Sequence, residues 1–417
     1  MDLLQLITLL LVISAGVSYL NQRFVKLPGT IGVVAISVVV SIVIVVIGKT
    51  NNELSDKIRD VSASMDFSRI LLDIMLGFLL FASALHFDYQ KLRKQQWPVF
   101  VLSTLGVFMS TTIFGLLLYY LCSLFGIELP LVYCFIFGAL ISPTDPIAVG
   151  AILKHSKISE KLSTVIAGES LFNDAVGLLL FVLLLEFVQQ PEAMISIGTV
   201  GSLLLHEILG GIAIGLVAGY SGYKLIKSIK DFQTILLLSV ALVLGISFLA
   251  NYFHASIPLA AVSAGLIIGN NSFHTDKVSD DFLLKMWKMI DEVLNTILFV
   301  MIGLQLVAMP FLEEYWLLGL FSIVIILIAR TVSVSLPALF LLGKLNVNNV
   351  LILAWAGLRG GISIAMALSL PDSQYKEGIL SGCYFIVLFS TIGQGLSINT
   401  LIAALDRKAL KSQTKRP

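Results

Sequence analysis

Thirteen apolar runs, separated by short polar turns, constrain the fold of this 417-residue chain more than any other feature. All but the ninth reach about 18 residues, the length at which an apolar run becomes a candidate transmembrane helix. Hydrophobic residues make up 57% of the chain and charged residues only 13%, whereas a soluble domain carries about 25% charged residues. We therefore predict an all-α polytopic membrane protein with about thirteen transmembrane helices.

The spans are predicted from the apolar runs and the polar turns that bound them. They cover residues 3–20, 31–48, 69–86, 98–125, 131–153, 160–188, 197–223, 232–251, 257–271, 282–309, 312–342, 347–370 and 378–404. The ninth run is short, and the first turns of the tenth carry four charged residues.

The distribution of basic residues predicts the orientation in the membrane. Twenty of the 27 Lys and Arg residues fall in or beside the odd-to-even connections and in the tail, and five fall on the opposite side. Because basic residues concentrate on the cytoplasmic side, this asymmetry places the C-terminus in the cytoplasm and the N-terminus outside. An odd number of spans is required for that result. The short tail is consistent with a prokaryotic protein, so we expect the bacterial inner membrane.

Two spans are interrupted by residues that break helices. The fifth contains Ser142-Pro143-Thr144-Asp145-Pro146, with two prolines that lack backbone donors. The twelfth contains Gly357-Leu358-Arg359-Gly360-Gly361, with three glycines in five residues. Paired broken helices in inverted halves indicate a transporter site at the bilayer midplane.

This spacing predicts a chain built from two inverted repeats. The first six-helix repeat would cover residues 1–190, a linker helix 191–230, and the inverted second repeat 231–406. A short basic cytoplasmic tail, 407–417, would follow. The fifth span of each repeat would then be a broken helix, and the two would cross near mid-membrane.

The segment Gly168-Glu169-Ser170-Leu171-Phe172-Asn173-Asp174 places ionisable groups inside the sixth span. An acid at that depth is costly and marks a functional site by default. On a helix Ser170 and Asp174 share one face, and Glu169 and Asn173 share the neighbouring face. A carboxylate beside a hydroxyl offers oxygen ligands to a cation such as Na⁺, and the carboxylate also binds a proton. Asp174 is therefore the first candidate for a cation and proton site. The alternatives are a buried acid satisfied by neighbouring helices and a Ser170 that bonds its own backbone.

The break in the fifth span offers further oxygens. Unwound backbone at this depth is tolerated where it lines a cavity or finds partners. Thr144 presents both a carbonyl and a hydroxyl. Asp145 has three open roles: binding a cation directly, binding it through water, or neutralising the N-terminus of a half-helix.

Arg330 and Arg359 are buried charges that require partners. Glu169 is an obvious partner for one of them. Arg359, at the glycine break, can compensate the C-terminal dipole of a half-helix. We expect both arginines to hold helices together rather than to take part in transport directly. Asp291 and Glu292, in the first turns of the tenth span, form either an acidic cytoplasmic funnel or an ordinary solvated helix end.

The three motifs at 142–146, 168–174 and 357–361 together resemble those of the monovalent cation:proton antiporters of the NhaP/NHE type. The resemblance covers nearly the whole membrane region. It implies homodimers, with a moving core of residues 97–190 and 312–404 and a dimerisation part of residues 1–96 and 191–311. It also implies that the transported Na⁺ and H⁺ are the only small partners, with no resident cofactor and no catalytic residue.

By the same resemblance, Asp174 would bind the cation or the proton, with Ser170 and Thr144 as further Na⁺ ligands. Asp145 would assist, and Asn173 would steady the unwound segment. Glu169 would pair with an arginine, for which Arg330 is the better match. Arg359 would stabilise the crossing broken helices.

One departure from the family pattern concerns the third span. Some relatives carry a glutamate there in a Leu-Phe-Glu-Ala pattern, where this chain reads Leu80-Phe81-Ala82-Ser83. Ala82 thus stands at the position of an oxygen ligand. Either the ligand is missing, or Ser83 or a water molecule substitutes for it.

The sequence therefore predicts an electroneutral Na⁺/H⁺ antiporter working by alternating access. A K⁺/H⁺ or electrogenic exchanger is the nearest alternative. A cation channel is the alternative from another class, although no repeated filter sequence supports it. A membrane enzyme is disfavoured, because we identify no protease-like or metal-ligand arrangement.

Overall fold

The computed structural model describes residues 3–48, 67–145, 158–189, 197–272, 277–309, 314–341 and 347–413, and every regular element within these ranges is a helix. Each of the thirteen predicted spans overlaps helix in the described residues. Pro146 of the first break and the rest of the predicted fifth span, up to residue 153, lie outside them, as do residues 414–417 of the tail.

The first six predicted spans correspond to seven helices of the α type and the turns that extend them. These are α1 (Leu3–Leu20), α2 (Gly29–Gly48), α5 (Leu76–Leu85), α7 (Gln96–Ser103), α8 (Leu105–Leu124), α9 (Leu131–Ile141) and α11 (Glu160–Gln189). Short α4 (Phe67–Arg69) and a π-helical turn, Ile70–Met75, precede α5. The short polar helix α6 (Tyr89–Lys94) connects α5 to α7, and the Asp88 carboxylate caps it by accepting from the Gln90 and Lys91 amides.

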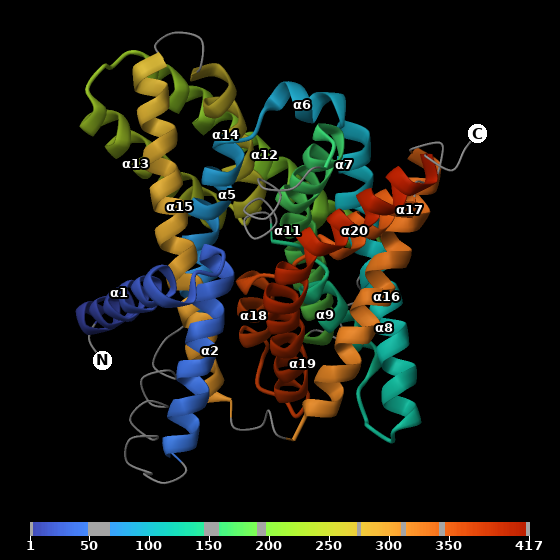
Figure 1. The fold of residues 1–417 in the computed structure, drawn as a ribbon. Coiled ribbons are helices and arrows are strands. Elements are labelled where there is room, and N and C mark those ends of the chain that lie inside the picture. Colours follow the sequence, from blue (N-terminus) through green and yellow to red (C-terminus); the bar gives the residue numbers. More distant parts are fainter. Residues whose placement is uncertain are drawn as a thin grey trace.

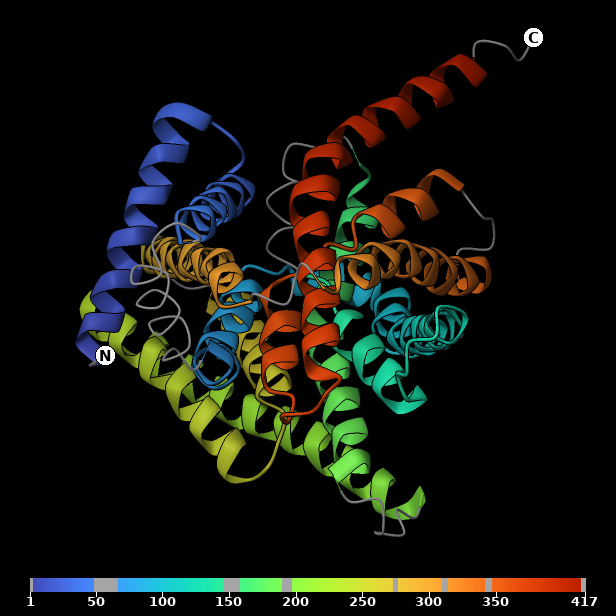
Figure 2. The ribbon, with the colours of Figure 1, turned by 90° about the horizontal axis from the view of Figure 1, so that it is seen from below.

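The remaining predicted spans correspond to nine helices and a further π-helical turn. These are α12 (Ile197–Lys227), α13 (Phe232–Tyr252), α14 (Ile257–Ser272), α15 (Lys277–Gln305), α16 (Trp316–Leu341), α17 (Val347–Trp355), α18 (Gly361–Leu368), α19 (Lys376–Leu388), the turn Phe389–Gln394, and α20 (Gly395–Gln413). Residues 407–413, predicted as part of a tail, therefore continue the last helix. Figure 2 shows this end of α20 extending away from the other helices.

Nine helices within the described residues are long and apolar enough to cross a membrane. The four predicted spans that miss this criterion do so for identifiable reasons. The fifth and twelfth are broken, α14 is short, and α15 carries charged residues in its first half. These are the same four features that the sequence shows.

The helices pack into two groups, which contact each other chiefly through α11 and the broken-helix segment α18. α1, α2, α5 and α12–α15 pack among themselves, and α7, α8, α9, α11 and α16–α20 form the second group. In Figure 1, α13 and α15 lie on one side, α8 and α16 on the other, and α9, α11, α18 and α19 between them. The division into a dimerisation part and a moving core remains a prediction.

Both helix breaks occur where the sequence predicts them. α9 ends at Ile141, and Ser142–Asp145 is not helical; Pro143 has no backbone N–H with which to continue the helix. α17 ends at Trp355, and α18 begins at Gly361 after five residues that are not helical. Such segments expose backbone groups in the interior of the molecule, and those groups need partners.

Candidate functional site

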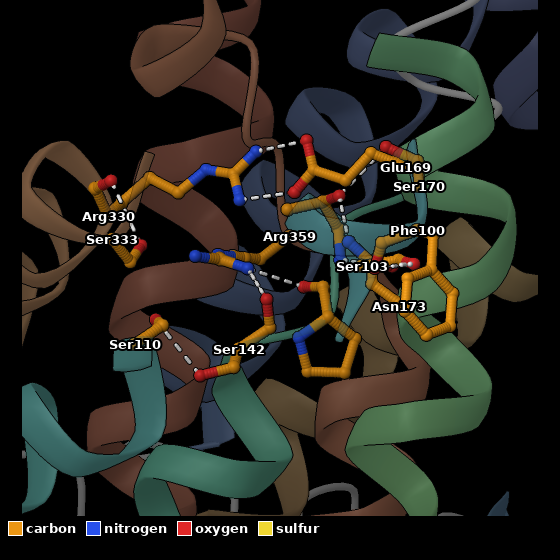
Figure 3. A network of polar contacts seen from close by, with 12 residues as sticks. Phe100, Ser103, Ser110, Ser142, Glu169, Ser170, Asn173, Arg330, Ser333 and Arg359 are labelled. Atoms are coloured by element: carbon orange, nitrogen blue, oxygen red, sulfur yellow. Dashed lines mark hydrogen bonds and ion pairs between the residues drawn. The ribbon is translucent and has the colours of Figure 1, made fainter. Parts of the chain in front are cut away.

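The two breaks satisfy each other's backbone groups. The Asp145 amide donates to the Leu358 carbonyl at 2.8 Å. Arg359 Nη1 donates to the carbonyl oxygens of Ser142 and Pro143, the second at 2.7 Å, as Figure 3 shows. A guanidinium thus lies at the C-terminal end of α9, where the helix dipole is negative. This position accords with the predicted compensation of a half-helix dipole by Arg359. The half-helix is α9, which precedes the other break.

The Asp145 carboxylate lies at the opposite kind of helix end. Gly360 is the residue before α18, and a Cβ on it would lie only 2.6 Å from Asp145 Oδ2 and 3.0 Å from Asp145 Cγ. The carboxylate therefore approaches the backbone at the N-terminus of α18, where the dipole is positive. Of the three roles open for Asp145, this position accords directly with neutralising a half-helix. It leaves contact with a cation open.

Asn173 holds the unwound segment through both groups of its amide. Its Nδ2 donates to Thr144 Oγ1 at 2.7 Å, and its Oδ1 accepts from the Thr144 amide at 3.2 Å. Thr144 Oγ1 lies 2.8 Å from Ser170 Oγ. All three side chains are buried. A helix, α11, thus fixes the position of two hydroxyls and a length of unwound backbone, as the resemblance implies for Asn173.

Asp174 lies one helical turn from Ser170 and lines a narrow cavity with Thr144 and Asp145. The cavity has a volume of about 20 Å³, room for about one water-sized group. Only 2% of Asp174 is exposed, and its Oδ2 has no hydrogen-bond partner among the described residues. A buried carboxylate oxygen without a partner is costly. The chemistry of these oxygens suits a small monovalent cation or a proton.

Glu169, five residues before Asp174, is fully paired. Arg330 Nη1 lies 2.5 Å from Glu169 Oε1, and Nη2 lies 2.8 Å from Oε2 (Figure 3). The Glu169 side chain is fully buried and that of Arg330 is 5% exposed. This two-pronged geometry joins α11 to α16. The structure therefore brings together the pair that the sequence suggested. It also gives the two buried acids of α11, Glu169 and Asp174, different surroundings.

The π-helical turn between α19 and α20 supports the second break, and the sequence analysis missed it. Ser390 Oγ accepts from the Arg359 amide at 2.8 Å, and Thr391 Oγ1 donates to the Arg359 carbonyl at 3.4 Å. Both side chains are buried. A π-turn inside a long helix often marks a functional site, but an isolated Ser-Thr pair in an apolar run gives little signal from sequence.

The third span contributes leucines to the cavity rather than the predicted oxygen. Leu76, Leu79 and Leu80 line it, and neither Ala82 nor Ser83 does. Ala82 is buried among apolar residues of α12–α15, and its carbonyl lies 2.7 Å from His86 Nδ1. Ser83 is half-buried one turn beyond the cavity. Ser83 therefore does not line the cavity in this arrangement of helices, and its role as a substitute ligand stays a prediction.

Two polar residues line the cavity that the sequence analysis did not single out. Ser363, in the first turn of α18, and Asn295, in α15, are both buried. Neither residue is charged or lies in a non-helical break, the two features that mark most of the other site residues in the sequence. A single uncharged amide in the apolar half of α15 was therefore passed over.

A second and wider cavity of about 520 Å³ lies between α6 and the start of α11. It is lined by polar residues that include His86, Asp88, Lys91 and Glu160. Lys91 Nζ lies 2.6 Å from Glu160 Oε1, and this hydrogen bond and charge raise the pKa of Lys91 above its usual range. In Figure 1, α6 and the C-terminal end lie toward the same end of the molecule.

Comparison with known proteins gives a consistent result. A family model described as "Sodium/hydrogen exchanger, transmembrane" matches residues 8–404. The chain is 39% identical to the Na⁺/H⁺ antiporter NhaP of Pseudomonas aeruginosa, covering 96% of each chain. It is 32% identical to the Na⁺/H⁺ antiporter NhaH of Halobacillus dabanensis, covering 96% of this chain and 97% of that one.

The fold also matches a solved structure. The sodium proton antiporter MjNhaP1 of Methanocaldococcus jannaschii superimposes with a TM-score of 0.77 over 97% of this chain and 99% of that one, at 20% sequence identity. That likeness concerns the fold alone. With the family model and the two relatives, it leads to one conclusion: this multi-pass membrane protein belongs to the sodium/hydrogen exchanger family.

Proposed function

We propose that the protein exchanges Na⁺ for H⁺ across the membrane, and that both bind at Asp174. The observation that carries this proposal is the environment of the Asp174 carboxylate. It is buried, lines a cavity with room for about one water-sized group, and has an oxygen without a hydrogen-bond partner among the described residues. Either a cation or a proton would remove that cost, and the two cannot do so at once.

The charges around the cavity support a one-for-one exchange. Arg330 neutralises Glu169 directly. Arg359 at the end of α9 and Asp145 at the start of α18 carry opposite charges, and each lies at a helix end that favours it. The remaining buried acid at the cavity is Asp174, and its negative charge would be neutralised by the transported ion. One Na⁺ or one H⁺ would provide this neutralisation, so the cycle would move no net charge.

Three residues would supply oxygens to Na⁺ as the transported substrate: Asp174, Ser170 and Thr144. Asp174 would contribute its carboxylate, and the other two would contribute hydroxyl or carbonyl oxygens. The contact of 2.8 Å between the hydroxyls of Thr144 and Ser170 supports this grouping. Asn173 would hold Thr144 in place. Asp145 would assist by neutralising the positive dipole at the N-terminus of α18. The scheme includes no resident cofactor and no catalytic residue.

Alternating access would come from movement of the core, residues 97–190 and 312–404, against residues 1–96 and 191–311. The separate packing of the two helix groups supports this division. We further propose inverted repeats, a homodimer formed by the second part, and a plasma-membrane location with the N-terminus outside and the C-terminus in the cytoplasm. With an inward proton gradient, the cytoplasm would then extrude Na⁺ and gain H⁺.

The proposal is tested with purified protein in liposomes that hold a pH gradient. Adding NaCl should dissipate the gradient, choline chloride should not, and an imposed membrane potential should leave the rate nearly unchanged. A larger response to KCl than to NaCl would favour a K⁺/H⁺ exchanger. A strong dependence on membrane potential would exclude the one-for-one scheme. Single-channel conductance would support a channel instead.

A further inference from the structure

Asn295 is one of two polar residues, with Ser363, that line the cavity and that the proposed scheme does not use. It lies in α15, outside the two broken helices, and only 2% of it is exposed. The apolar wall of the same cavity includes Leu76, Leu79, Leu80 and Leu298. Another leucine at position 295 would continue this wall without burying a polar group. The burial of an amide at this position therefore needs a functional or structural explanation.

The orientation of the Asn295 amide is fixed by its own helix. Nδ2 donates to the Asp291 carbonyl at 2.8 Å and to Asp291 Oδ1 at 3.0 Å. Both atoms are acceptors, and a backbone carbonyl cannot donate, so the nitrogen must face Asp291. Oδ1 must then point elsewhere, and it is buried without a hydrogen-bond partner among the described residues.

Two unpartnered buried oxygens thus belong to residues that line one cavity, Asp174 Oδ2 and Asn295 Oδ1. A neutral donor group between them would satisfy one or both, and a cation would satisfy both. Side-chain carbonyl and carboxylate oxygens are the ligands that hard cations prefer. Two such oxygens at one cavity indicate a ligand rather than a local structural bond.

The position of α15 is set by close packing on the second break. A Cβ on Gly361 would lie 2.5 Å from Leu298 Cδ1, so the start of α18 and α15 touch directly. Leu298 lies one turn beyond Asn295 on the same helix face. Asn295 is therefore held at a fixed distance from the broken helices in this arrangement.

We propose that Asn295 Oδ1 is a further oxygen ligand for the transported Na⁺, together with Asp174. This inference rests on the proposed function and adds a residue from outside the two breaks to the site. Because an amide oxygen coordinates a cation but does not take up a proton near neutral pH, Asn295 would favour Na⁺ in its competition with H⁺. It would thus contribute to the affinity for Na⁺ and leave the chemistry of proton binding to Asp174.

Two substitutions separate ligation from structure. Asn295→Leu keeps the approximate volume and removes the oxygen. Asn295→Asp loses the amide that bonds Asp291 but keeps an oxygen for the cavity. Ser239→Ala is a matched control. Ser239 is a buried residue of α13, away from the cavity, and its hydroxyl accepts at 3.0 Å from Nε1 of Trp287, which lies in α15 like Asn295.

The experiment measures each variant in two ways. Proteoliposomes give the KM for Na⁺ and the maximal rate of proton movement, and purified protein in detergent gives the rise in Tm on adding NaCl in place of choline chloride. For Asn295→Leu we expect KM to rise about fivefold, with the maximal rate retained and a smaller NaCl-induced Tm shift. Asn295→Asp should keep the Tm shift, and Ser239→Ala should lower Tm without changing KM.

The outcomes distinguish this inference from the proposed function. If wild-type protein shows neither Na⁺-driven proton movement nor a NaCl-induced Tm shift, both are overturned. If wild-type protein shows both effects and Asn295→Leu keeps the wild-type KM and Tm shift, only the role of Asn295 is overturned. If Asn295→Leu does not fold, Asn295→Asp decides, because it retains an oxygen at this position. Loss of the NaCl-induced Tm shift in Asn295→Asp would then overturn the role of Asn295.

Discussion

Arg330 and Glu169 form a buried ion pair in which each terminal guanidinium nitrogen contacts one carboxylate oxygen, at 2.5 and 2.8 Å. The pair joins α16 to α11 one turn away from the cavity that Asp174 lines. Two acids five residues apart on one helix therefore have different surroundings. One is compensated by a fixed charge, and the other faces a cavity.

Removing one partner of this pair should destabilise the protein strongly. Arg330→Gln or Glu169→Gln leaves an uncompensated buried charge, which costs about 3–5 kcal/mol. The double variant Glu169→Gln/Arg330→Gln leaves no charge and should recover most of the loss. Thermal unfolding in detergent measures all three. Equal destabilisation by the double and single variants would contradict a role as an ion pair.

Arg359→Gln should impair both stability and transport. It removes the charge that faces the carbonyls of Ser142 and Pro143 at the end of α9. We expect a loss of about 2–4 kcal/mol and a strongly reduced rate of proton movement in liposomes. Arg359→Lys keeps the charge and should retain part of both. If Arg359→Lys loses as much stability and transport as Arg359→Gln, the positive charge at the end of α9 does not account for the role of Arg359.

Gly360→Ala should disturb the site through a single methyl group. Gly360 has an extended backbone, φ −116°, which alanine also adopts. The new methyl group would instead clash with the Asp145 carboxylate. We expect this overpacking to lower the free energy of unfolding by about 1–3 kcal/mol and to reduce transport. Gly245→Ala is the matched control.

Gly245 lies inside α13, and a Cβ there meets nothing within 4 Å. Replacing a helical glycine by alanine should raise stability by about 1 kcal/mol, with transport unchanged. Parallel measurements of Tm and of Na⁺-driven proton movement compare the two variants. A harmless Gly360→Ala would contradict the close approach of Asp145 to α18.

Ser170→Ala should weaken Na⁺ binding more than it changes the maximal rate. It removes a hydroxyl that lies 2.8 Å from Thr144 Oγ1 and one turn from Asp174. We expect KM for Na⁺ to rise about fivefold. Ser322→Ala, which removes an equally buried hydroxyl that bonds the Leu318 carbonyl of its own helix, should leave KM unchanged. A wild-type KM in Ser170→Ala would remove Ser170 from the ligand set.

The breaks were predictable because they follow from local chemistry. Pro143 lacks an N–H, and Gly357, Gly360 and Gly361 together weaken a helix, whatever surrounds them. The pairing of Glu169 was also predictable in kind, because a buried acid and a buried arginine in one membrane protein need partners. The choice between Arg330 and Arg359 required the resemblance to a family.

The contacts between the breaks were not predictable from sequence. Arg359 binds carbonyls 216 and 217 residues away, and nothing local in either segment specifies that meeting. Asn295 was missed because a lone amide in an apolar helix gives no pattern. Ser83 was suggested because it neighbours Ala82, whereas helical geometry places the leucines of the preceding turns against the cavity.

The central claim, that one carboxylate at Asp174 exchanges Na⁺ for H⁺, is tested most directly by proton movement in liposomes with wild-type protein and Asp174→Asn. Wild-type protein should dissipate a pH gradient when NaCl is added, and its KM for Na⁺ should rise as the pH falls, because the proton competes for the same group. Asp174→Asn, with nearly the same shape and no titratable oxygen, should show no Na⁺-driven proton movement while remaining folded. Na⁺-driven proton movement in Asp174→Asn at a rate near that of wild-type protein would contradict the account.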